Sequence, residues 1–125
     1  MWVRHLMDCV PFVAGDGTEL RELIHPDKHP LALRYSLAWA WLPAGRTSVP
    51  HSLVTSEVYV VLKGTGLMHI NEEVQRIQPG DVVYIPPQAV QFVHNDGQEI
   101  LEFLCLVDPA WRQEDETVYA PAPSS

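Results

Sequence analysis

Short apolar or alternating runs recur along the whole chain and are separated by segments rich in Gly, Pro, Asn and Asp. The runs are LRELI, YSLAWAWL, SEVYVVL, GLMHI, VVYI, VQFV and ILEFLCLV, at residues 20–24, 35–42, 56–62, 66–70, 82–85, 90–93 and 100–107. Runs of this length bounded by turn-forming residues are typical of β-strands. Seven or more such strands at this spacing predict an all-β sandwich or barrel.

Two of these runs are apolar at consecutive positions rather than at alternate ones. They are VYVVL at residues 58–62 and FLCLV at residues 103–107. A sheet with one solvated face alternates apolar with polar residues, so both faces of these two strands must be covered. The N-terminal segment or a second copy of the chain would supply the cover, and we expect a homodimer.

Length and composition indicate a single domain over residues 1–125. A chain of 125 residues has the ordinary size of one domain. Hydrophobic residues make up 46% of the chain and charged residues 19%, which is enough apolar material for a packed core and unlike a disordered chain.

The charge balance excludes two classes of partner. The 16 acidic residues against 8 basic ones give a formal net charge of −8, which repels nucleic-acid phosphates and anionic lipid headgroups. No apolar stretch reaches the length of a signal peptide or a membrane span. Cys9 and Cys105 lack the paired spacing of a disulfide framework or a zinc site. We predict a cytoplasmic protein that binds neither nucleic acid nor membranes.

Residues 35–107 resemble the cupin family of small β-barrels, which is defined by two signature motifs. Seven positions fall in register with these motifs: Gly45, His51, Glu57 and Gly64 with the first, and Gly80, Pro86 and Asn95 with the second. The resemblance implies a double-stranded β-helix, or jelly-roll, barrel. It leaves residues 1–34 for N-terminal strands and residues 108–125 for a C-terminal extension.

The resemblance also implies where a metal would bind. In complete members of the family three histidines and one glutamate hold a divalent metal, because imidazole and carboxylate suit Mn, Fe, Ni, Zn or Cu. In this chain Leu53 and Gln91 stand where two of the histidines belong, and Gln88 replaces a glycine. The remaining candidate ligands are His51, Glu57 and the amide oxygen of Gln91. Because an amide is a weak ligand for a transition metal, the predicted centre is degenerate.

Two other interpretations of the same residues remain open. Gln91 and His51 could donate hydrogen bonds to Glu57 in a purely structural polar cluster, which would satisfy groups that are costly to bury. Alternatively, Glu57 and His51 could bind the polar groups of a small molecule. The apolar wall of that recognition site would be formed by Tyr59, Leu53, Trp39 and Trp41.

The remaining histidines compete poorly as ligands. His94 is three residues from Gln91 and so lies on the opposite strand face, His69 is expected to point outward, and His25 and His29 lie in a loop. The C-terminal segment is expected to lie across the barrel with Trp111 as its anchor.

The function predicted from these residues is binding of a small molecule of unknown identity inside the barrel, with a degenerate divalent-metal centre. The resemblance implies an alternative, a metal-dependent dioxygenase, isomerase or decarboxylase acting on a small organic acid, sugar or polyketide-like compound. A second alternative is a structural or sensor dimer without catalysis.

Overall fold

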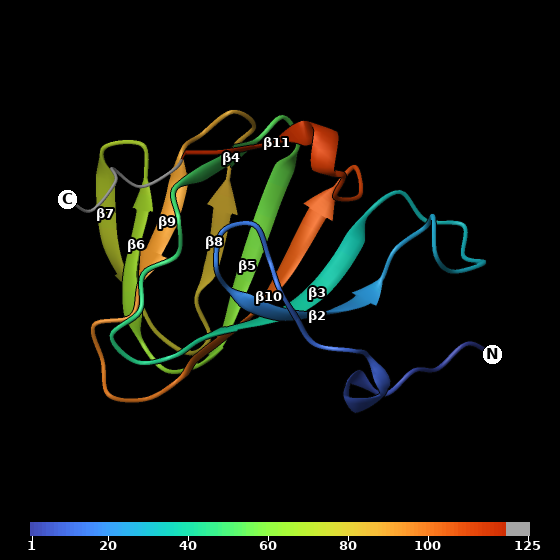
Figure 1. Cartoon of the computed structure of the whole chain (residues 1–125), viewed down its shortest axis with the longest axis horizontal. Coiled ribbons are helices and arrows are strands. Elements are labelled where there is room, and N and C mark those ends of the chain that lie inside the picture. The colour runs from blue at the N-terminus through green and yellow to red at the C-terminus, as the bar shows by residue number, and fades with distance from the viewer. Residues whose placement is uncertain (120–125) are drawn as a thin grey trace.

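The chain folds into two antiparallel β-sheets that face one another (Figure 1). The computed structural model describes residues 1–119. The six-stranded sheet has the order β1 (Phe12–Val13), β2 (Glu19–Ile24), β3 (Ser36–Leu42), β10 (Leu101–Asp108), β5 (Ser56–Lys63) and β8 (Val82–Ile85). The five-stranded sheet has the order β11 (Glu116–Val118), β4 (His51–Leu53), β9 (Gln91–His94), β6 (Gly66–Ile70) and β7 (Glu73–Ile77).

Helical structure is confined to two short turns in the described part of the chain. These 3-10 turns are η1 (Leu6–Asp8) and η2 (Gln113–Asp115). None of the helical segments within residues 1–119 has the length and apolar character needed to cross a bilayer.

The predicted all-β class is confirmed, and each of the seven predicted runs contains a strand. Strand β10, near the end of the chain, pairs with both β3 and β5 in the middle of the six-stranded sheet. The hydrophobic pattern does not predict β7, because four of its five side chains are exposed and the segment lacks apolar alternation.

Inward-facing side chains from both sheets form the core. Alternation along each strand sends every second residue into this space. Its large buried members include Leu42, Val61, Met68, Ile85, Val93 and Phe103. Full burial of one such side chain contributes about 1.5–3 kcal/mol, so this packing holds the two sheets face to face.

Two of the motif positions serve the turns of the barrel rather than a site. Gly64 has a φ of +79°, and a Cβ there would lie 2.4 Å from the carbonyl oxygen of Ile100, so a larger residue does not fit. Asn95 is fully buried, and its amide nitrogen donates to the carbonyl oxygens of Leu42 and Glu99 at 2.9 and 2.8 Å. These contacts tie the loop before β10 to the end of β3.

The outer face of the six-stranded sheet carries two apolar rows across β3, β10, β5 and β8. One row contains Leu37, Leu106, Val58 and Tyr84, and the other contains Trp39, Leu104, Val60 and Val82. Val82 and Tyr84 are 67% and 60% exposed. Because soluble monomers rarely expose large contiguous apolar patches, we propose that a second copy of the chain packs on this face.

Replacing Val82 by Glu should separate the two copies. The new charge would lie within the apolar face, and because Val82 is already exposed the fold should survive. We expect the wild-type chain to sediment as a dimer and Val82→Glu as a monomer in analytical ultracentrifugation. Val74→Glu, at a 55% exposed position on β7 of the other sheet, is the matched control and should stay dimeric. A monomeric wild type, or a dimer that withstands Val82→Glu, would contradict the proposal.

Candidate functional site

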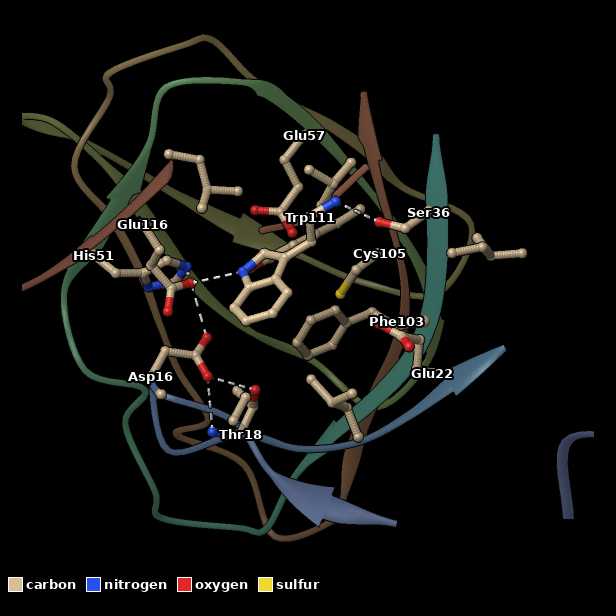
Figure 2. Close-up of a pocket in the computed structure, with 18 of the residues that line it drawn as sticks. Asp16, Thr18, Glu22, Ser36, His51, Glu57, Phe103, Cys105, Trp111 and Glu116 are labelled. Atoms are coloured by element: carbon tan, nitrogen blue, oxygen red, sulfur yellow. Dashed lines mark hydrogen bonds and ion pairs between the residues drawn. The ribbon is translucent and has the colours of Figure 1, made fainter. Parts of the chain in front are cut away.

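A cavity of about 270 Å³ lies between the sheets at one end of the barrel (Figure 2). Ser36, Ala38 and Cys105 line it from β3 and β10. At the other end of the same two strands, the paired residues Leu42 and Leu101 are almost fully buried in the core. Small side chains at one end therefore leave the space that leucines fill at the other.

A chain of three side chains crosses the floor of the cavity. Strand β5 places Glu57 and Tyr59 on its inward face, and β9 places Gln91 opposite them with no exposed surface. Tyr59 Oη donates to Gln91 Oε1 at 2.9 Å, and Gln91 Nε2 donates to Glu57 Oε1 at 2.8 Å. The amide of Gln91 is thus engaged on both sides and orients the carboxyl group of Glu57.

His51, on β4, is oriented by a different contact. Its Nδ1 lies 3.0 Å from the carbonyl oxygen of Val49, and because a carbonyl only accepts, this nitrogen carries the proton. Its Nε2 is 3.7 Å from Oδ2 of Asp16. The prediction that Gln91 donates to Glu57 is confirmed, whereas His51 faces Asp16 instead.

Burial has a large effect on Glu57. It raises the pKa of this carboxyl group from 4.5 to about 7, and although the hydrogen bond from Gln91 and the charge of His51 oppose the rise, desolvation dominates. The nearby carboxylates of Asp16 and Glu116 raise the pKa further. Near neutral pH this group therefore exchanges a proton readily.

Tyr59 and Cys105 stay protonated in the same environment. Burial raises the pKa of both groups well above their usual values, and the charge of Glu57 adds to the effect. Because the thiolate is the reactive form of cysteine, Cys105 acts as a wall residue of the cavity rather than as a nucleophile.

Four of the predicted site residues, His51, Leu53, Glu57 and Tyr59, line the cavity, and Gln91 lies behind them. The prediction of Trp39 and Trp41 as part of the wall is wrong. On β3 the small residues Ala38 and Ala40 take the inward positions, so both indoles point to the outer face. There the guanidinium of Arg21 lies 5.9 Å from the Trp41 ring centre.

The mouth of the cavity is bordered by the turn before β2 and by the segment that follows β10. Trp111 crosses it as expected, with its backbone nitrogen donating to Ser36 Oγ at 2.9 Å and its indole nitrogen to Glu116 Oε2 at 3.3 Å. His25 is buried and its Nε2 lies 2.8 Å from the carbonyl oxygen of Trp111, so this histidine fixes the segment and is not a solvated loop residue. Figure 2 shows Asp16, His51 and Glu116 on one side of the indole, with Phe103 and Cys105 on the other.

Sequence reasoning missed Asp16 and Glu116. Asp16 lies in the turn GDGT, where its Oδ1 accepts from Thr18 N and Oγ1 at 3.0 and 2.6 Å, and such a residue ordinarily indicates only a turn. Glu116 ends the acidic run EDE, which is typical of a solvated surface. Neither pattern reveals that the segment folds over a barrel mouth.

The ligand set implied by the family motif does not fit a metal centre here. Leu53 offers no donor atom, and the amide oxygen of Gln91 already accepts from Tyr59. Within residues 1–119, no three His, Cys, Asp or Glu side chains converge in an arrangement that could hold an ion. Of the predicted ligands, only His51 and Glu57 remain available to a metal, and ordinary catalytic metal sites have three strong protein ligands.

Known proteins share this fold. Residues 39–107 match the sequence model of a protein family described as "Cupin domain". An uncharacterized protein of Methanocaldococcus jannaschii is 36% identical over 109 residues, which are 86% of each chain. A predicted oxalate decarboxylase from Thermotoga maritima has a TM-score of 0.75 at 23% identity, covering 86% of this chain and 99% of that one. A polyketide cyclase from Streptomyces resistomycificus has a TM-score of 0.74 at 19% identity, covering 92% and 89%.

The raised pKa of Glu57 predicts a pH-dependent loss of stability in chelator-treated protein. Below pH 4.5 this group is protonated in both the folded and the unfolded state, so it has no effect. As the pH rises from 4.5 to about 7 the unfolded chain ionises first, and the folded state loses on the order of 3 kcal/mol. Relative to Glu57→Gln, the wild type should lose unfolding free energy across this window and no more above it, as measured by urea denaturation.

Glu72→Gln is the matched control for this measurement. Glu72 is exposed in the turn between β6 and β7, so its neutral variant should follow the wild-type curve at every pH. Parallel curves for wild type and Glu57→Gln would show that the carboxyl group is not desolvated.

Proposed function

The chain belongs to the cupin family, and on that basis we propose that its barrel binds a small organic molecule in the cavity beside Glu57 and His51. The observation that carries the proposal is a cavity with mostly apolar walls and a few oriented polar groups at one end. Ligand sites generally combine these two features, because the walls supply binding energy and the polar groups fix orientation.

A second candidate function is proton transfer to or from the bound molecule. The pKa of Glu57, about 7, is in the range that suits a general acid or base. The carboxyl group is held by Gln91 and leaves one oxygen toward the cavity, and His51 on β4 lines the same cavity with its Nε2 3.7 Å from Asp16 Oδ2. Proteins of the same fold include a predicted oxalate decarboxylase and a polyketide cyclase, so catalysis on this scaffold has precedent.

We also propose that the protein is located in the cytoplasm. This proposal is supported by the two cysteines, which are both free: Cys9 is buried near the N-terminus, and Cys105 lines the cavity. Disulfides are the usual staples of small extracellular domains.

Filling the cavity should abolish binding without unfolding the chain. Ala38 lines the cavity from β3, so Ala38→Leu extends a side chain into open space. In a thermal-shift screen with a defined library of small organic molecules, compounds that stabilise the wild type should have no effect on Ala38→Leu. Ala32→Leu, at an exposed loop position, is the control and should respond like the wild type. Equal responses in Ala38→Leu would place binding elsewhere.

Metal analysis separates this proposal from the metal-dependent alternative. Binding that persists in chelator, with metal well below one ion per chain, would support recognition by the protein's own groups. Near-stoichiometric metal in the untagged wild type that is lost in Glu57→Ala would favour a metal-dependent enzyme instead. Absence of any ligand response would favour the structural or sensor dimer.

A further inference from the structure

The hydrogen-bonding atoms that line the cavity indicate the chemistry of its ligand. Four side-chain donors of the described lining residues are already engaged by protein acceptors: Thr18 Oγ1 by Asp16, Tyr59 Oη by Gln91, Trp111 Nε1 by Glu116 and His51 Nδ1 by the carbonyl oxygen of Val49. The remaining donors are the Ser36 hydroxyl, which accepts from the backbone nitrogen of Trp111, the weakly donating thiol of Cys105 and the carboxyl group of Glu57 when it is protonated. The cavity thus has few donors to offer a ligand.

Acceptors, in contrast, are left open at the same end. Four atoms there have no hydrogen-bond partner within residues 1–119: Asp16 Oδ2, Glu57 Oε2, Glu116 Oε1 and His51 Nε2. Two of them, Asp16 Oδ2 and His51 Nε2, face one another at 3.7 Å, which is longer than a hydrogen bond. The two residues that carry the deepest of these atoms, Glu57 and His51, are only 6% and 4% exposed. Among the described residues the one fully buried polar side-chain atom without a partner is Thr55 Oγ1, so these acceptors are open to the cavity. A molecule that brings donors to this end would form hydrogen bonds with them.

The charges of the lining residues point the same way. Four acidic side chains, Asp16, Glu22, Glu57 and Glu116, line the cavity, and no Lys or Arg side chain does so among the described residues. Glu22 is paired with Lys28, and Asp16 lies 3.7 Å from His51 Nε2. Glu57 and Glu116 have no ion-pair partner within the described residues. In a cleft with low-dielectric walls such a field attracts cations and repels anions.

Aromatic rings complete the surroundings. Phe103 and Trp111 lie in the wall beside the carboxyl groups (Figure 2), and Tyr59 packs on Phe103 with ring centres 4.6 Å apart. Ring faces of this kind attract cations and also accept the apolar body of a ligand. Among residues 1–119 no three His, Cys, Asp or Glu side chains converge as a metal cage. An organic cation with several N–H donors therefore satisfies the separated acceptors better than a single ion.

We propose that the cavity binds a small organic cation, an ammonium group carried on an apolar body. The ammonium group would donate to Asp16 and Glu116, and the apolar body would pack against Phe103 and Trp111. This assignment rests on the proposed function, because it names the ligand class of the same cavity. It also disfavours the small organic acids that the family resemblance alone includes.

Two sets of matched probes test the assignment by isothermal titration calorimetry at pH 7 in chelator. One set is benzylammonium, benzyl alcohol and benzoate, and the other is n-butylammonium, n-butanol and butyrate. Within at least one set the ammonium should bind about tenfold or more tightly than the alcohol, as expected for one hydrogen bond to a charged group. The carboxylates should not bind.

Isosteric variants locate the binding group. Asp16→Asn and Glu116→Gln each remove one charge while keeping an acceptor oxygen for Thr18 or Trp111, and each should weaken ammonium binding by about tenfold. Their affinity for the alcohols should not change. Glu72→Gln removes a charge from the exposed turn between β6 and β7 and should leave every affinity as in the wild type.

Three outcomes would overturn the assignment. Alcohols or carboxylates that bind as tightly as the ammonium probes would refute the ligand class while leaving small-molecule binding intact. If no probe of either set binds, the cation assignment also fails, and the library screen with Ala38→Leu decides the proposed function separately. In a titration without chelator, Mn²⁺ that binds at one ion per chain and is lost in both Asp16→Asn and Glu116→Gln would assign the acceptors to a metal instead.

Discussion

A carboxyl group held inside an apolar barrel is the constraint on which the interior of this protein depends. Transfer of Glu57 from water is unfavourable, and the hydrogen bond from Gln91 offsets only part of that cost, as the pKa of about 7 reflects. Gln91 in turn needs Tyr59 to satisfy its oxygen. At the motif position where complete family members use a metal-binding histidine, this chain instead uses an amide that is committed to orienting the carboxyl group.

The chemistry of the cavity is completed by segments outside the barrel motifs. Asp16 comes from the turn between β1 and β2, and Trp111 and Glu116 follow β10, so all three lie outside the matched residues 39–107. His25 links these two regions through the carbonyl oxygen of Trp111. Proteins that share the barrel but differ in these segments would have different side chains around the opening of the cavity. This is one physical reason why a common fold does not imply a common activity.

The parts of the site that the sequence predicts are those fixed by strand periodicity. The two-residue alternation places Glu57 and Tyr59 on one face of β5, and motif spacing brings Gln91 opposite them. The same alternation could not decide which face of β3 points inward, because large residues usually fill a core. Here a cavity replaces part of the core, so Ala38 faces inward and Trp39 faces outward. Asp16 and Glu116 depend on tertiary docking, which local patterns do not encode.

The cavity lies on the inner face of β3, β10 and β5, and the apolar outer rows cross the outer face of the same three strands. On β10, Phe103 and Cys105 line the cavity while Leu104 between them points outward. On β3, Ala38 lines the cavity and Trp39 lies in the outer row. A second copy packed on that outer face would restrict the backbone that carries the cavity wall. Because a rigid wall lowers the ordering cost of binding, association of two chains and ligand affinity should favour one another in this architecture.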